Sequence, residues 1–408
     1  MAAHSLDDLR RVIRRIETRR PKRPAAQPIE EVLGGELVDT GEGQLLVVRR
    51  EFPLSYRHGR QPLGAALEAP LDLLSAVARA ESPVEDARRL LFLDAETTGL
   101  AGGTGTYAFL VGAAWVEDDR LVLAQHFMRD FDEEPALLAA LRPLLERASG
   151  MVTFNGASFD LPLLETRFIM ARRRWPATLP HLDLLRPARR VWTSCFADCR
   201  LATLEREVVG VVREDDIAGA LIPALYFDFL RSRRAAPLGR VLAHNRDDIL
   251  TLVGLLGWFG DALTARAELS AGELGGLGRL WEPVDAERAL ACYRAALAAG
   301  LEGAPAQAVR LHLARWEKRH ARWDAARSLW EAAARHTGFD PRPWEELAKL
   351  HEHRRRDFVT ARAVVEDALG LAEAAGAPVR TVDAFTHRLG RLERRLTLAA
   401  AQPPESRG

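Results

Sequence analysis

Two acidic residues stand at the end of an apolar run. Residues 90–100 read LLFLDAETTGL, so four apolar residues lead directly into Asp94 and Glu96. This pattern is typical of a buried strand that carries acids at its exit, and strand alternation places both side chains on one face. Carboxylates on one face repel each other, and a hard divalent cation is a common partner for such oxygen ligands. A solvated strand end with acids by chance is the alternative.

A third acid follows a second short apolar run. Residues 151–154 predict a buried strand, Asn155 and Gly156 predict a turn, and Asp160 falls in the first turn of the next helix, with Ser158 as a candidate cap. A helix predicted over residues 134–147 connects this strand to the first one. Such a connection implies parallel pairing, which brings Asp160 to the same sheet edge as the first two acids.

A histidine and a fourth acid lie near residue 245. Apolar residues recur at helical spacing through residues 238–256, and within this segment His244 and Asp248 are four residues apart. Both side chains therefore project from one face of the predicted helix. A lone buried histidine is usually a satisfied core residue, but three converging acids elsewhere make this pair a candidate for catalysis.

The remaining elements would build the sheet that holds these groups. Residues 107–116 and 121–127 predict two strands that form an antiparallel meander with the first strand, and residues 181–185 predict a fifth strand. The acids at 214–216 precede an apolar segment and predict the N-terminal cap and first turn of a helix. Residues 29–88 alternate turn residues with short apolar runs, and a polar cluster that contains His58 predicts no chemistry there.

Composition limits the class of protein. A chain of 408 residues predicts two or three domains, and 57 basic against 57 acidic residues give no global field that would indicate a nucleic-acid partner. Three cysteines cannot form a disulfide framework, and Cys195, Cys199 and His181 lack a fourth ligand for zinc. No secretory signal or run of about 20 apolar residues is present, so we expect a cytoplasmic protein without a membrane partner.

Three motifs carry a family resemblance. DAETTGL, NGASFD and HNRDD, in this order, resemble the DEDD superfamily of 3′ to 5′ exonucleases, which have a ribonuclease H-like fold. Together with HLDLLRPARRVW, CRLATLEREVVG and REDDIAGALIP they are similar to the bacterial YprB-type ribonuclease H-like family. The resemblance covers roughly residues 89–260. It implies an α/β domain with a mixed five-stranded sheet flanked by helices.

The resemblance also implies the roles of the acids. The four metal-binding carboxylates, which would hold two Mg²⁺ or Mn²⁺ ions, would be Asp94, Glu96, Asp160 and Asp248. Asp247 is the weaker choice, since it would leave His244 only three residues away. In the superfamily a Tyr four residues before the last Asp, or a His five residues before it, positions the attacking water. This chain carries His244 at the Tyr spacing and Ala243 at the His spacing, so the catalytic role predicted for His244 departs from the family pattern.

The implied reaction is hydrolysis of single-stranded DNA or RNA from the 3′ end by two metal ions. Residues predicted to contact the substrate are Thr97, Leu100, Asn155 and Asn245. The two asparagines could instead satisfy backbone groups at the starts of helices. Two further classes remain open: a nucleic-acid-binding or scaffold protein with a weak active site, and a structure-specific endonuclease.

The flanking regions predict other domains. Residues 1–88 would form an extension that begins with a basic amphipathic helix, either solvated or facing nucleic acid, before the nuclease domain at 89–262. Residues 270–398 predict an all-α array with a 36-residue period, which resembles tetratricopeptide repeats and could bind a protein partner. A generic helical-hairpin array is the alternative, and residues 399–408 predict a disordered tail. The period appears in three sets, Ala289, Ala325 and Ala361, then Tyr293, Leu329 and Val365, then Ala296, Ala332 and Ala368.

Overall fold

The computed structural model describes residues 27–99, 104–176, 179–336 and 338–400. The predicted basic N-terminal helix and Leu100 lie outside these residues, as does the predicted tail beyond residue 400. The chain divides into two compact units, one made of residues 1–186 and 200–266 and the other of residues 187–199 and 267–408. Each unit is described by itself.

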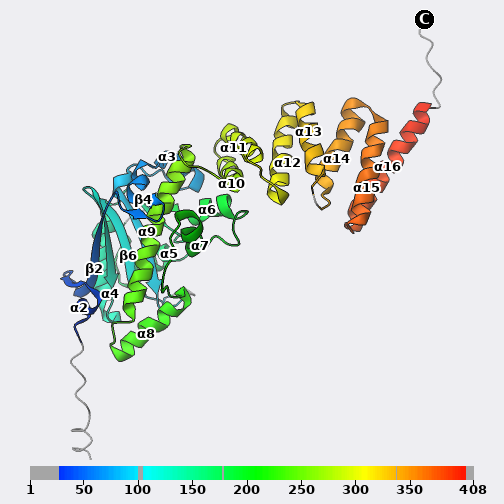
Figure 1. Ribbon diagram of the computed structural model, residues 1–408. Coiled ribbons are helices and arrows are strands. Elements are labelled where there is room, and N and C mark those ends of the chain that lie inside the picture. The colour runs from blue at the N-terminus through cyan, green and yellow to red at the C-terminus, as the bar shows by residue number, and fades with distance from the viewer. Residues whose placement is uncertain (1–26, 100–103, 177–178, 337, 401–408) are drawn as a thin grey trace, which may run out of the picture. The chain divides into compact units, whose positions relative to one another are not determined.

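The first unit is built on a mixed sheet of seven strands in the order β1-β2-β7-β6-β5-β8-β9 (Figure 1). β5, β6 and β7 pair antiparallel, whereas β5, β8 and β9 pair parallel, as the helical connection predicted. The strands are β1 (Glu36–Asp39), β2 (Gln44–Pro53), β5 (Leu90–Thr97), β6 (Ala108–Glu117), β7 (Arg120–Phe127), β8 (Gly150–Thr153) and β9 (His181–Asp183).

The predicted strand count of five was wrong because the N-terminal extension supplies two more. β2 pairs antiparallel with β7 along eight residue pairs, and β1 pairs with β2 at the sheet edge. Only the first half of β2 is buried, and its second half carries the charged run Arg49–Glu51. β1 pairs with residues 44–47 of β2, so the charged run lies at an edge of the sheet beyond this pairing, where polar side chains are allowed on both faces. The run therefore breaks the apolar pattern by which a strand is predicted.

Helices flank this sheet, and the longest, α9 (Leu238–Leu263), contacts β5, β6 and β7 (Figure 1). α4 spans Glu134–Arg147, as predicted. The other helices of the unit are α2 (Ile29–Leu33), α3 (Leu71–Ala78), α5 (Asp160–Met170), α7 (Leu201–Leu204) and α8 (Ile222–Ser232), and α6 (Leu185–Trp192) spans the division between the units. Shorter elements are the hairpin β3 (Arg57–His58) and β4 (Gln61–Pro62), the π-helical turn η4 (Glu205–Val209), and the 3₁₀ turns η1 (Leu63–Glu68), η2 (Ala87–Arg89), η3 (Phe131–Glu133) and η5 (Gly219–Leu221).

One row of residues across the sheet explains where α9 lies. Asp94, Gly112 and Gln125 are aligned on neighbouring strands. The Asn245 side chain of α9 lies directly over Gly112, where any Cβ atom would collide with the amide. Glycine at this position therefore lets the helix approach the sheet closely, and the approach brings the polar stretch of α9 to the acids of β5.

The second unit is all-helical, as predicted. Its helices are α10 (Ala271–Trp281), α11 (Ala286–Ala298), α12 (Gly303–Arg319), α13 (Trp323–Ala334), α14 (Pro341–Lys349), η6 (Leu350–Arg355), α15 (Phe358–Ala374) and α16 (Val379–Ala400). None of the described helices is long and apolar enough to cross a membrane. The first two residues of the predicted tail, 399 and 400, continue α16.

The 36-residue repeat slips by one residue in its middle copy. Ala289 and Ala361 are buried, but Ala325 is exposed and the buried residue is Ala326. The same shift makes Trp330 the buried aromatic of that copy, in place of Leu329. The period is therefore 37 residues and then 35, because α12 has 17 residues whereas α14 and η6 have 9 and 6, and a fixed period assigns the middle helix wrongly.

Candidate active site

The first two acids lie where β5 ends. Asp94 and Glu96 share one face of β5, and a bulge between Glu96 and Thr97 shifts the pairing with β6. Bulges commonly redirect side chains beside active sites. The Asn245 amide donates hydrogen bonds to the Asp94 carboxylate (2.9 Å to Oδ2) and to its backbone carbonyl (3.2 Å), which fixes the carboxylate against α9.

Asp160 reaches the same sheet edge from the helix that follows β8, the parallel neighbour of β5. It is the first residue of α5, which follows β8, and its buried carboxylate accepts hydrogen bonds from its own backbone N–H and from that of Ala95. The residue before the helix is Phe159, so Ser158 is not the cap as predicted. The turn is held instead by Asp183 of β9, which accepts hydrogen bonds from the N–H groups of Asn155 (2.8 Å) and Ala157 (3.2 Å).

The four predicted carboxylates lie close enough for the charges of three of them to raise the pKa of Asp94. Burial raises the pKa of Asp94 well above its usual value, and the charges of Asp248, Glu96 and Asp160 raise it further. Burial likewise raises the pKa of Asp248. The pKa of Glu96 rises to about 7 through burial, against the opposing effect of the nearby His244, and that of Asp160 rises to about 7 through burial. The sheet edge thus gathers more negative charge than its protein neighbours neutralise.

His244 lies between two carboxylates. Its Nδ1 atom is 2.8 Å from Oδ1 of Asp216, and its Nε2 atom is 3.5 Å from Oδ2 of Asp248. Burial lowers the pKa of the imidazole, but Asp248, Asp216 and Glu96 together raise it above its usual value. With Nδ1–H donating to Asp216, Nε2 faces the carboxylate cluster.

The assignment of Asp216 to a helix cap was wrong, because α8 begins only at Ile222 with Leu221 before it. Asp216 belongs to the loop that leads to α8, and its side chain meets His244 of α9, 28 residues along the chain. A contact across that separation leaves no local pattern in the sequence.

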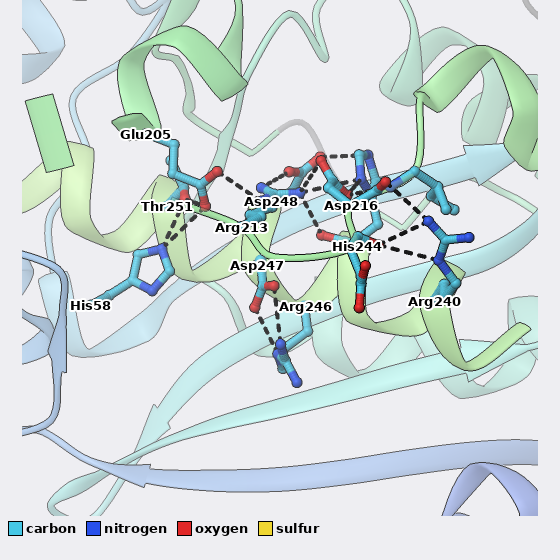
Figure 2. Close-up of polar contacts among 12 residues, drawn as sticks. His58, Glu205, Arg213, Asp216, Arg240, His244, Arg246, Asp247, Asp248 and Thr251 are labelled. Carbon is cyan, nitrogen blue, oxygen red and sulfur yellow. Dashed lines mark hydrogen bonds and ion pairs between the residues drawn. The ribbon is translucent and has the colours of Figure 1, made fainter. Parts of the chain in front are cut away.

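A buried arginine connects the site to the N-terminal extension (Figure 2). Arg213 bonds to Oδ1 of Asp248 and, through Nε, to Oε2 of Glu205 at 2.7 Å. Oε1 of Glu205 accepts a hydrogen bond from Thr251 (2.9 Å) and lies 3.5 Å from Nε2 of His58. Sequence analysis missed these residues, and the only signal for Arg213 is its place in the segment REDDIAGALIP.

The neighbouring acids of α9 are separated by their partners. Asp247 pairs with Arg246, with Nε to Oδ1 at 2.7 Å, and Figure 2 shows this pair apart from Asp248. Asp248 instead faces Arg213 and His244. The contacts therefore favour Asp248 over Asp247 as the fourth carboxylate of the cluster.

A cleft of about 460 Å³ opens beside these acids. It is lined by the site acids Glu96 and Asp160, by Thr97 and Asn155, and by apolar residues that include Phe154 and Phe159. Phe159 is 54% exposed, which is unusual for so large an apolar side chain. Of the predicted substrate contacts, Thr97 and Asn155 thus line the cleft, whereas Asn245 is fully buried and bonds to Asp94 and Gln125.

The donor set fits divalent cations. Four carboxylates supply hard oxygen ligands, and burial raises the pKa of each of them, with a further rise from neighbouring carboxylates at Asp94 and Glu96. Within the described residues, however, no group of three or more His, Cys, Asp or Glu side chains is already arranged to hold an ion. Several of the oxygens are engaged by protein donors, since Asn245 bonds to Asp94 and Arg213 to Asp248.

The segment that carries these residues matches a known family. Residues 91–260 match the family model of the RNase_H superfamily. The chain is also 38% identical over 223 residues to the uncharacterized protein YprB of Bacillus subtilis (strain 168), a match that covers 52% of this chain and 53% of that protein. The chain thus spans about half the length of the relative that it matches. The predicted resemblance and the ribonuclease H-like fold of this segment are confirmed, whereas the tetratricopeptide assignment stays a prediction.

Proposed function

We propose that this ribonuclease H-like domain is a divalent-metal-dependent nuclease that removes nucleotides from the 3′ ends of single-stranded DNA or RNA. The observation that carries the proposal is the convergence of four carboxylates with raised pKa values beside His244. Strongly perturbed carboxylates beside a cleft are typical of active sites. A sheet edge that served only to stabilise the fold would gain nothing from this repulsion.

The residues divide the work of phosphodiester hydrolysis. Two Mg²⁺ or Mn²⁺ ions would be held by Asp94, Glu96, Asp160 and Asp248. When bound, they supply an activated hydroxide and stabilise charge on the leaving oxygen. His244, fixed by Asp216, presents Nε2 toward the carboxylates, where it can take a proton from the attacking water. The water oxygen adds to phosphorus, the P–O3′ bond breaks, and the 3′-oxygen takes up a proton.

The cleft supports action at a strand end. Its volume of about 460 Å³ is in the range of small-molecule pockets and suits one nucleotide rather than a duplex. The exposed ring of Phe159, which precedes Asp160, offers a surface on which a base can stack regardless of its identity. Both features favour a single-stranded substrate whose last nucleotide enters the cleft.

The test is degradation of 5′-labelled single-stranded DNA and RNA by the wild type and by Asp94→Ala. We expect a ladder of shortening products with Mn²⁺ or Mg²⁺ that disappears with chelator and with the variant. A substrate with a 3′-phosphate block separates the endonuclease alternative, which would still cut it. Absence of cleavage on every substrate, together with gel shifts unchanged by Asp94→Ala, would contradict the proposal and favour a binding protein.

A further inference from the structure

Arg213 is the most fully engaged cation of the site. Its side chain is 7% exposed, and each of its three nitrogens contacts an acceptor. Nε bonds to Glu205 at 2.7 Å and Nη2 bonds to Asp248. Nη1 lies 3.5 Å from the backbone carbonyl oxygen of His244 and 3.6 Å from Oδ2 of Asp216, beside Nδ1 of the same histidine at 3.2 Å. The guanidinium therefore touches a predicted metal ligand, the predicted general base and the carboxylate that fixes the base (Figure 2).

The Arg213 guanidinium is also bound by a buried carboxylate outside the predicted metal-binding set, that of Glu205. Glu205 is 2% exposed, and Thr251 and His58 occupy its other oxygen. If Arg213 swung away, the buried Glu205 carboxylate would lose the guanidinium that neutralises it, which is costly. His58 is itself anchored, because the backbone N–H of Arg60 bonds to the carbonyl of Val209 in η4 at 2.7 Å. The position of the cation is thus fixed by the fold.

One carboxylate oxygen of Asp248 is engaged while Arg213 is in place. Its Oδ1 atom bonds to Arg213 and its Oδ2 atom lies 3.5 Å from Nε2 of His244. Arginine remains charged at any working pH, so it also repels a second cation nearby. A divalent ion that binds at Asp248 must share the carboxylate with this fixed charge.

We propose that Arg213 is a positioning residue that acts as a built-in counter-cation: it holds Asp248 in place and competes with divalent ions for that carboxylate. The inference rests on the proposed metal-dependent function and adds a regulator of ion affinity to it. It predicts that ion binding on the Asp248 side is weaker than four carboxylates alone would give. It also predicts that the site stays folded without ions because Arg213 offsets part of the repulsion.

The test is Mn²⁺ binding to the full chain in the absence of nucleic acid, measured by calorimetric titration, with thermal unfolding in chelator as a second readout. For Arg213→Gln we expect Mn²⁺ binding to tighten about tenfold or more, because a repelling charge leaves and Oδ1 of Asp248 becomes available. The midpoint of unfolding in chelator should fall, and Mn²⁺ should restore it.

Two further variants keep the test decisive. The double variant Arg213→Gln/Glu205→Gln removes the buried pair together, so it should keep the tighter binding with a smaller loss of stability. Arg240→Gln is the matched control and should leave Mn²⁺ affinity unchanged, because among the described residues Arg240 bonds to the backbone carbonyls of Asp215 and Asp216 and to none of the four carboxylates.

Unchanged or weaker Mn²⁺ binding in the folded double variant would overturn the inference and leave Arg213 a purely structural residue. The nuclease proposal is judged separately, from cleavage by the wild type. A wild type that degrades DNA or RNA, with arginine variants that bind Mn²⁺ no more tightly, would reject the counter-cation while retaining the enzyme. If the wild type cleaves nothing but the arginine variants bind Mn²⁺ more tightly, the nuclease proposal would be rejected and the counter-cation role of Arg213 retained.

Discussion

Buried carboxylates have pKa values shifted in opposite directions in the two units of this molecule. In the helical unit, the side chain of Glu352 is fully buried and accepts hydrogen bonds from Arg388 (2.9 Å) and Arg391 (2.8 Å), with Arg395 at 3.7 Å. Although burial raises the pKa of Glu352, Arg391 and Arg388 lower it below its usual value. At the sheet edge, burial and mutual repulsion leave the pKa values of the four site carboxylates raised.

The difference in pKa shift distinguishes a carboxylate that stabilises the fold from carboxylates that serve a reaction or bind a ligand. Glu352 is surrounded by cations that the chain supplies, so it needs nothing from solution. The carboxylates around Asp94 share Arg213, His244 and the neutral Asn245, which do not offset their repulsion. A fold keeps such a deficit of positive charge only where binding a cation or a substrate later removes it.

The largest effect is expected when one carboxylate of the cluster at the sheet edge is replaced by a neutral amide. Asp94→Asn should lower metal-dependent cleavage by about 10³-fold or more, because it removes a ligand from the centre of the site. The same change should raise the midpoint of unfolding in chelator, since it relieves repulsion. Initial rates on 5′-labelled single strands and thermal unfolding measure the two effects.

The matched control for that change is Asp247→Asn, one residue from Asp248 on α9. Asp247 is already paired with Arg246, so its loss should change the rate by no more than about threefold. Equal losses in the two variants would show that the cluster, as described, is not the site of the reaction.

The sequence predicted the elements that position the acids because each one leaves a local pattern. The apolar run before Asp94, the helix at 134–147 and the i,i+4 spacing of His244 and Asp248 are all short-range signals. The parallel pairing of β5 and β8 then follows from chain connectivity. These features suffice to bring Asp94, Glu96 and Asp160 to one edge, whereas Asp248 joins them because Gly112 lets α9 approach the sheet.

The partners of those acids could not be predicted, because they come from distant segments. His58 lies 147 residues before Glu205, and Arg213 lies 35 residues before Asp248. Nothing in a loop sequence distinguishes an arginine that will be buried against a carboxylate from one that will be solvated. β2 was missed for a related reason. Its charged half has the sequence pattern of a loop, and its pairing with the distant strand β7 leaves no local signal.

The second largest effect concerns the base beside the acids. His244→Gln should lower kcat by about 10²-fold and leave KM nearly unchanged, because the imidazole serves proton transfer rather than binding. Asp216→Asn should give a smaller loss, since it keeps the imidazole but weakens its orientation. Steady-state rates on a short labelled oligonucleotide provide both constants. A rise in KM at constant kcat would assign His244 to substrate binding instead.

A third substitution tests Glu352, the buried carboxylate that is neutralised by arginines. Glu352→Gln should lower the free energy of unfolding of the helical unit by about 2 kcal/mol, because it leaves neighbouring arginines without their buried partner. Part of that cost is relieved since these arginines reach solvent. Urea unfolding measures the change, and Glu373→Gln, an exposed position on α15, is the control. Mn²⁺ affinity should stay the same in both variants. A change in Mn²⁺ affinity would show that the two sets of acids are coupled.

The smallest effect is a difference in the sign of pH dependence. Glu96 holds a proton more tightly in the folded state, where its pKa is about 7, than in the unfolded chain, where it is 4.5. Between these pH values the folded state binds more protons, so in chelator the free energy of unfolding should fall as pH rises. Glu96→Gln should remove this part of the slope, and saturating Mn²⁺ should abolish the slope in the wild type.

Glu352 should show the reverse dependence. Its pKa is lowered from 4.5, so its contribution is present above that pH and is lost only as the pH falls through the lower folded value. Urea unfolding of the wild type, Glu96→Gln and Glu352→Gln at several pH values separates the two contributions. If Glu96→Gln left the slope between pH 4.5 and 7 unchanged in chelator, the edge acids would be as well compensated as Glu352. The electrostatic argument for a cation site would then fail, even with the fold and the cleft as described.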